Sequence, residues 1–189
     1  MKIIFEIVKM KKILGFTLSL VLLLSACKDA RTKQYEEITK LNAALMEAVK
    51  KDPTQVDKQA AKTLIEKSEA FVAQFPKDTV SAGLLFKAAE LNSGIGEYGK
   101  AIKIWGDVNT NYPTYKRAGD ALFMQAFTFD EYLHDKDNAI TYYKSFINNY
   151  PNHSMKANAT QLLSLLEGGK DFNDIIKEFE QKNKSEIGR

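Results

Sequence analysis

The chain has 189 residues, 44% of them hydrophobic and 27% charged, which is typical of one soluble globular domain with its own core. Of its 27 basic and 24 acidic residues, four lysines and one glutamate lie in residues 1–26, which leaves 23 of each sign in residues 27–189. This balance removes the electrostatic argument for nucleic-acid binding. Four prolines and few β-branched runs favour helical structure.

The first 26 residues have the pattern of a secretory signal peptide. Lysines at positions 9, 11 and 12 precede the apolar run "ILGFTLSLVLLL", and the small residues "SA" follow it. A transmembrane helix is the alternative, but the uncharged run over residues 13–26 has 14 residues, where a span needs about 20. We therefore predict a signal peptide over residues 1–26.

The stretch "LLLSACKDA" resembles a bacterial lipobox that ends at Cys27. The resemblance implies cleavage before Cys27, a diacylglyceryl thioether on its sulfur, and acylation of the new α-amine. Cys27 is the only cysteine, so no disulfide can form within one molecule. Two or three acyl chains would anchor the protein to a membrane in an effectively permanent way.

The residues around the lipobox suggest a start site, a tether and a destination. Met10 begins a compact signal by itself, so we hypothesise that Met10 rather than Met1 is the true start. Residues 27–32 are polar and suit a tether to a helical domain over residues 33–189. Lys28 is not the aspartate that retains lipoproteins in the inner membrane of enteric bacteria, which favours the outer membrane, facing the periplasm. Lys28-Asp29 also partly resembles the surface-export signal of Bacteroidetes lipoproteins.

Three aromatic-proline pairs divide the body of the chain. Phe75-Pro76, Tyr112-Pro113 and Tyr150-Pro151 are separated by 37 and 38 residues. A fixed period of this length is the signature of a helical solenoid. The apolar residues before each proline have helical spacing, and a proline disfavours helix at the residue before it. Each proline is therefore predicted to end one helix pair and to open the next.

The repeat resembles the tetratricopeptide repeat, and its length and closing pairs are most similar to the BamD and CpoB (YbgF-like) branch of envelope proteins. The matching packing residues are Ala89, Gly96, Tyr98, Ala101, Trp105 and Pro113 in the best repeat, and Ala126, Ala139, Tyr143 and Pro151 in the next. The resemblance implies an all-α fold, a right-handed solenoid of helical hairpins with about eight helices in four pairs over roughly residues 33–182. Terminal repeats of such a stack are expected to be atypical.

The stretch "NSGIGEYGKA" (residues 92–101) matches two phosphate-binding patterns, G-x-G-x-x-G and most of G-x-x-x-x-G-K. Phosphate loops join a strand to a helix, whereas the preceding "AGLLFKAAEL" is helical in pattern. Ala101 also replaces the Ser or Thr that would bind magnesium. We therefore interpret the stretch as a helix–helix turn in which Gly94 and Gly96 adopt positive φ angles, and we predict no nucleotide cofactor.

The sequence offers no catalytic or metal-binding constellation. His134 and His153 are the only histidines and have no thiol or third histidine to complete a usual zinc site. There is no G-x-S-x-G elbow, and the sole cysteine is predicted to carry lipid. We therefore expect no enzyme activity and no metal, and a role in glycan processing in trans is only a remote alternative.

In tetratricopeptide stacks, the first helices of the pairs line a groove that binds peptides. The resemblance places these groove candidates at Phe86, Glu90, Phe123, Phe127 and Asp130, although core packing of the phenylalanines is an equal alternative. We expect a membrane-anchored adaptor that binds an envelope protein or peptide segment, and no nucleic acid. The alternative is an assembly factor for outer-membrane or cell-wall machinery that acts through its convex face or by self-association.

Overall fold

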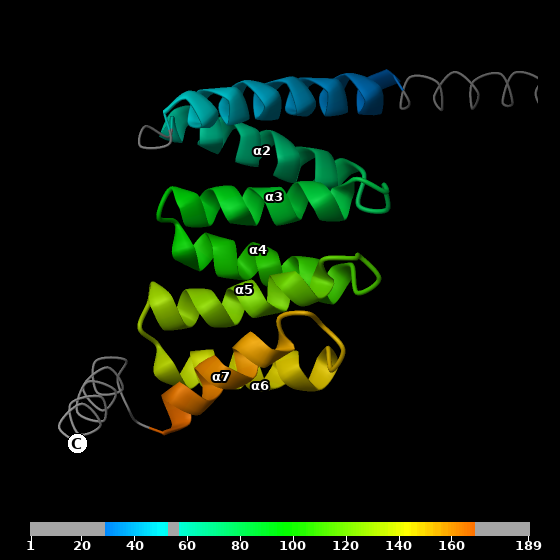
Figure 1. Cartoon of the computed structure of the whole chain (residues 1–189). Coiled ribbons are helices and arrows are strands. Elements are labelled where there is room, and N and C mark those ends of the chain that lie inside the picture. The colour runs from blue at the N-terminus through cyan, green and yellow to red at the C-terminus, as the bar shows by residue number, and fades with distance from the viewer. Residues whose placement is uncertain (1–28, 53–56, 169–189) are drawn as a thin grey trace, which may run out of the picture. The chain divides into compact units, whose positions relative to one another are not determined.

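A computed structural model describes residues 29–52 and 57–168 of the chain. These residues contain seven helices and no strand (Figure 1). The chain divides into two compact units, Met1–Ser81 and Ala82–Arg189, which are described one at a time. The predicted all-α class of paired helices is confirmed. The predicted signal peptide, Cys27 and the part of the predicted solenoid after residue 168 lie outside the described residues.

The first unit is a helix pair. A helix over residues 29–51 is followed by α2 (Lys58–Gln74). Asp57 caps the N-terminus of α2, where its carboxylate accepts hydrogen bonds from the backbone N–H groups of Gln59 and Ala60, both at 2.9 Å. The buried apolar side chains of this unit are Ile38, Leu45, Ala61, Leu64, Ile65, Phe71 and Val72.

The beginning of this pair differs from the predicted tether. Residues 29–32, which we expected in the tether, already belong to the first helix. The guanidinium of Arg31 donates two hydrogen bonds to the carboxylate of Asp78, at 2.7 and 2.9 Å, and lies 5.9 Å from the ring centroid of Phe71. This bidentate ion pair and cation–π contact hold the polar first turn against the unit.

The second unit contains the two best-formed repeats. Its helices are α3 (Ser81–Gly94), α4 (Tyr98–Asn111), α5 (Ala118–Glu131), α6 (Lys136–Asn149) and α7 (Lys156–Glu167), and α3 begins at the last residue of the first unit. Short turns join α3 to α4 and α5 to α6, whereas longer turns that contain the predicted prolines join one pair to the next. None of the described helices is both long and apolar enough to span a membrane.

The aromatic-proline pairs build the same turn three times. Phe75, Tyr112 and Tyr150 each follow the last residue of a helix, and each donates its N–H to the carbonyl four residues earlier. Three positions after each aromatic residue, a backbone N–H donates a hydrogen bond to the carbonyl of that aromatic residue; the three donors are Asp78, Tyr115 and His153. The next helix begins three positions after each donor. The prediction that each proline separates two helix pairs is therefore confirmed.

Small and aromatic residues of the repeat lie in the interior as expected. The fully buried members are Ala89, Ala101, Trp105, Ala126, Ala139 and Tyr143. Alanines allow the backbones of crossing helices to approach, and the large rings fill the remaining space. Pro113 and Pro151 lie in the turns that follow α4 and α6, where the missing N–H breaks no helical hydrogen bond.

The glycine-rich stretch forms the turn between α3 and α4. Gly96 has a φ of +87°, a conformation that costs glycine little. Gly94 is the last residue of α3 and has no positive φ, so that part of the prediction is wrong. In the next repeat His134 takes the equivalent place, two residues before α6, with a φ of +52°. The helices on both sides confirm that this stretch is a helix–helix turn.

Candidate partner-binding surface

The predicted groove residues separate into buried and accessible side chains. Phe86 in α3 and Phe123 in α5 are only 1% and 5% exposed, so their assignment to an open groove is wrong. The ring of Phe123 packs 5.8 Å from that of Tyr143 and 5.5 Å from that of Phe146. Phenylalanines spaced four apart on a helix are equally suited to core and to groove, and here the second helix of the same pair covers one of them.

Glu90, Phe127 and Asp130 remain partly exposed. Glu90 lies one turn after Phe86 on α3, whereas Phe127 and Asp130 lie in the second half of α5. These three side chains reach the surface of the first helices of two successive pairs. The accessible surface around these residues has two parts, a charged part around Glu90 and an aromatic part around Phe127.

The charged part is a network of ion pairs and hydrogen bonds that we call the charged network, formed by Glu90, Arg117, Asp120 and His153. Arg117 donates to Glu90 at 3.2 Å and to Asp120 at 3.0 Å. Its guanidinium carbon lies 3.6 Å from the ring centroid of Phe86, so the buried phenylalanine makes a cation–π contact with Arg117. The network connects α3 to the beginning of α5.

His153 extends the charged network to the turn before α7. Its Nε2 lies 3.1 Å from a carboxylate oxygen of Asp120, and its Nδ1 accepts a hydrogen bond from the backbone N–H of Met155 at 3.2 Å. An Nδ1 that accepts leaves Nε2 to carry the proton, so Nε2 donates to Asp120. The imidazole therefore ties the turn between α6 and α7 to the first turn of α5.

His153 occupies a position that recurs in each closing turn, the second residue after the proline. Asp78 and Tyr115 occupy it in the other two turns. Asp78 binds Arg31 at the beginning of the preceding first helix, and the ring of Tyr115 contacts that of Phe86 at 6.4 Å. Each turn is thus fastened to the first helix of the pair before it by a different side chain. The constant spacing from proline was the signal in the sequence that could have identified this position.

The aromatic part lies at the turn between α5 and α6, and we call it the turn patch: Tyr98, Phe127, Asp130, Tyr132 and Leu133. The rings of Tyr98 and Tyr132 stack at 4.5 Å, and Phe127 meets Tyr132 edge-on at 6.2 Å. Tyr132 and Leu133 are 46% and 43% exposed, the most exposed large hydrophobic side chains among the described residues. Nothing in the sequence marked these two residues, because they follow the helix and do not belong to its apolar stripe.

Asp130 is the charged member of the turn patch. Its carboxylate accepts a hydrogen bond from the hydroxyl of Tyr143 at 3.3 Å. Burial raises the pKa of Asp130 above its ordinary value, although the Tyr143 hydrogen bond acts in the opposite direction. Burial and the nearby carboxylate also raise the pKa of Tyr143, so this phenol remains a hydrogen-bond donor. The hydrogen bond from the neutral Tyr143 hydroxyl is long, so it compensates only in part for the water that the Asp130 carboxylate loses on burial.

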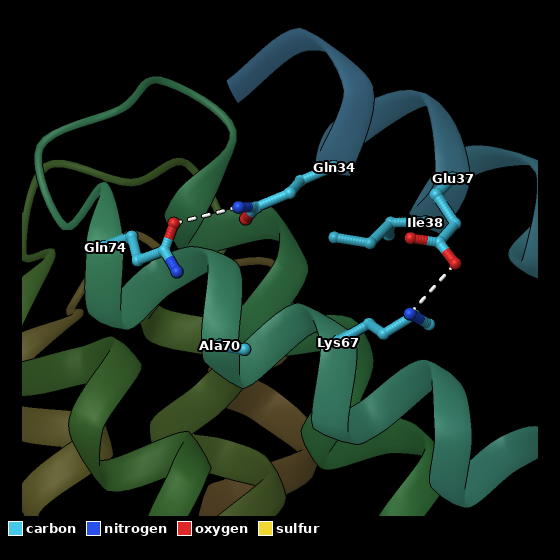
Figure 2. Close-up of a pocket in the computed structure, with 6 residues that line it drawn as sticks. All are labelled: Gln34, Glu37, Ile38, Lys67, Ala70 and Gln74. Carbon is cyan, nitrogen blue, oxygen red and sulfur yellow. Dashed lines mark hydrogen bonds and ion pairs between the residues drawn. The ribbon is translucent and has the colours of Figure 1, made fainter. Parts of the chain in front are cut away.

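A small pocket of about 140 Å³ lies in the first unit. Figure 2 shows its lining, in which Gln34 donates to Gln74 at 2.9 Å and Lys67 pairs with Glu37 at 2.9 Å. The polar side chains are thus paired across the two helices, with Ile38 and Ala70 between them. This arrangement is a polar seam between packed helices, and it supplies no free charge for a ligand.

The described residues also bear on the predicted absence of cofactor sites. Within residues 29–52 and 57–168, no group of three or more His, Cys, Asp or Glu side chains is placed to hold a metal ion. Lys100, which matched the lysine of a phosphate loop, pairs with Glu97 at 3.2 Å in the first turn of α4. His134 and His153 lie at separate turns: His134 adopts the positive φ of the turn before α6, and His153 contacts Asp120 from the turn before α7.

Comparisons with known proteins returned a match to a family model and matches to solved structures. A family model described as tetratricopeptide repeat matches residues 120–153, from the first turn of α5 through α6 to the following turn. A structure described as "Crystal structure of MamA" superposes with a TM-score of 0.46 at 22% identity, covering 78% of this chain and 89% of that chain. No curated protein matches the chain. Residues 120–153 are thus a tetratricopeptide repeat, whereas similarity to BamD and CpoB stays a prediction.

Proposed function

We propose that this protein is a lipid-anchored, non-catalytic adaptor of the bacterial cell envelope that binds a segment of another protein. The observation that carries the proposal is the surface formed by the first helices of the second unit. There the charged network links α3, α5 and the turn before α7 through the Arg117–Glu90 ion pair and the hydrogen bond from His153 to Asp120, and at the opposite end of α5 the turn patch exposes Tyr132 and Leu133. Accessible aromatic and arginine side chains on a rigid scaffold are typical of protein interfaces.

The location of the adaptor rests on Cys27. The lipobox-like sequence supports lipid attachment at this residue, and Lys28 supports the outer membrane facing the periplasm. Residue 29, the first that the structure describes, is already helical, so Lys28 alone would separate the lipid-bearing Cys27 from the described helix. In this proposal the membrane holds the helical units near its surface, where an envelope protein supplies the bound segment.

The anchor is tested by replacing Cys27 with Ser in the native host. We expect the wild-type chain in the membrane fraction and its N-terminal peptide to carry acyl chains in mass spectrometry, whereas Cys27→Ser remains in the uncleaved precursor or in the aqueous fraction. Separation of inner and outer membranes on a density gradient then tests the destination. A wild-type chain without lipid on Cys27 would contradict the proposal.

The adaptor role is tested by photo-cross-linking in the same cells. A benzoylphenylalanine at Glu131, exposed at the end of α5, should form a discrete adduct with one envelope protein. The same amino acid at Glu69, exposed on α2, is the matched control and should not form it. Equal adducts from both positions, or none from either, would count against partner binding on the first helices of the second unit.

A further inference from the structure

The turn patch combines features that a surface of purely structural origin does not require. Its two exposed side chains, Tyr132 and Leu133, follow the last residue of α5 and leave apolar area in water. Tyr98 and Phe127 support Tyr132 from two sides, which holds the exposed ring in one orientation. A rigid aromatic side chain loses little conformational entropy on binding, which is why such residues are common at the centres of interfaces.

The charge around the turn patch is predominantly negative. Residues 130–137 contain four carboxylates, Asp130, Glu131, Asp135 and Asp137, against one lysine, Lys136. Asp135 uses its carboxylate to cap α6, accepting from the N–H of Asn138 at 3.1 Å. Within the part of the chain that the structure describes, the hydrogen bond that the Asp130 carboxylate accepts is the long one from Tyr143, and His134 is near enough to lower the pKa of Asp130 without donating a hydrogen bond to it. Glu131 is exposed and has no ion-pair partner among the described residues.

Resting on the function proposed above, we infer that the turn patch is the docking point for a partner segment in which an apolar side chain stands next to lysine or arginine. The apolar side chain packs on Tyr132 and Leu133, and the cation binds the carboxylates of Asp130 and Glu131. A cation would supply the charged donor that Asp130 lacks, and a charge-assisted hydrogen bond is stronger than its present bond to a phenol. An acidic segment would meet four carboxylates and be repelled.

The position of the patch also distinguishes it from the predicted groove. Phe86 and Phe123, which would form the apolar floor of a groove, are buried in the interior. The accessible apolar surface is instead displaced to the end of α5 and the turn after it. A partner segment would therefore lie across the turns within the helix pairs, where Tyr98 of one repeat and Tyr132 of the next are already stacked.

The inference is tested with a library of random peptides displayed on phage, selected on the purified full chain in detergent micelles. The library is depleted beforehand on the double variant Tyr132→Ser/Leu133→Ser. We expect enriched peptides to carry an apolar residue adjacent to Lys or Arg. Fluorescence anisotropy with the best synthetic peptide should show affinity at least tenfold weaker for the double variant and for Asp130→Asn, and steeply weaker binding at high salt.

Control variants keep the outcome specific. Glu69→Gln removes an exposed carboxylate from α2 and should bind the peptide as the wild-type chain does, and circular dichroism melting should show that each variant is folded. Enrichment without a basic residue, equal binding by Asp130→Asn, or no enrichment over the double variant would overturn the inference. So would a change from dimer to monomer in the double variant, since a second copy would then be the occupant. Failure of the anchor would appear separately, in the fractionation of Cys27→Ser.

Discussion

Single side chains in this protein determine how each closing turn is attached to the helix pair before it. The second residue after each proline is an aspartate, a tyrosine and a histidine in turn, and each contacts the first helix of its own pair. The backbone hydrogen bonds of the three turns are the same, so the turn tolerates different side chains provided that each finds a partner. The partner varies from Arg31 for Asp78 to Asp120 for His153.

The ion pair between Asp78 and Arg31 should make stability depend on acidity. The hydrogen bonds from Arg31 lower the pKa of Asp78 from 3.8 to about 2. Because the folded protein binds this proton less readily than the unfolded chain, the stabilisation is present above pH 3.8 and is lost as the pH falls towards 2. Asp78→Asn should lower the free energy of unfolding by about 1 kcal/mol at neutral pH, since the pair is partly exposed.

Urea unfolding monitored by circular dichroism between pH 2 and pH 7 measures this effect. The difference between the wild-type chain and Asp78→Asn should shrink through the acidic range and vanish near its lower end. Glu69→Gln serves as the control for removal of a carboxylate without a partner. A difference that stays constant with pH would show that the Asp78 carboxylate is not held by Arg31 in solution.

Two substitutions in the turns within the helix pairs should change the free energy of unfolding in opposite directions. Gly96 and His134 both have positive φ angles, which cost a side chain with a Cβ about 1 kcal/mol. Gly96→Ala should therefore lower the free energy of unfolding by about 1 kcal/mol, and His134→Gly should raise it by about 0.5 kcal/mol. Gly94→Ala is the control, because Gly94 is helical and nothing lies within 4 Å of an added Cβ. Thermal unfolding of the three variants would contradict the assignment if all shifted in the same direction.

Helices of this protein were more predictable than the surfaces they present. The period of the aromatic-proline pairs correctly gave the ends of α2, α4 and α6, because a proline forces the same break in any context. The apolar stripe of α5 could not reveal which of its phenylalanines is covered, since burial of Phe123 depends on Tyr143 and Phe146 from another helix. Charge pairing across helices, as between Arg117 and Glu90, likewise depends on packing that one helix does not encode.

Trp105 of α4 fills the protein interior with an indole ring, which has a cost in stability because its N–H group is buried as well. The side chain is fully buried, and its Nε1 has no hydrogen-bond acceptor among the described residues. A buried donor without a partner costs about 1–3 kcal/mol. Trp105→Phe removes this donor together with some packing area, so it should change the free energy of unfolding by less than about 1 kcal/mol, whereas Trp105→Ala should cost about 3–5 kcal/mol.

Chemical denaturation of the two Trp105 variants separates these contributions. The outcome to watch is the ratio of the two losses rather than either alone. Should Trp105→Phe prove nearly as damaging as Trp105→Ala, the indole N–H must have an acceptor in solution, such as a buried water molecule.

At the scale of the whole molecule, the chain consists of two units that each contain their own buried side chains. Length and composition led us to expect one helical domain over residues 33–189, and that expectation stays a prediction because residues 169–189 lie outside the described residues. Sequence alone could not place the boundary between Ser81 and Ala82, since the repeat pattern continues across it without a change in composition. In repeat proteins each repeat contacts only its neighbours, so stability is a sum of local terms.

This local character leads to a prediction about how damage spreads through the chain. Ala126 is fully buried in α5, and Ala126→Leu would overpack the crossing with its neighbours at a cost of about 1–3 kcal/mol. Hydrogen exchange measured by mass spectrometry should then show faster exchange in α5 and α6, with the pair formed by residues 29–51 and α2 at wild-type protection. Ala157→Leu, at an exposed position of α7, is the control and should leave every helix unchanged. Equal loss of protection in both units would mean that the protein unfolds as one cooperative body, and it would favour the single domain that the sequence predicted.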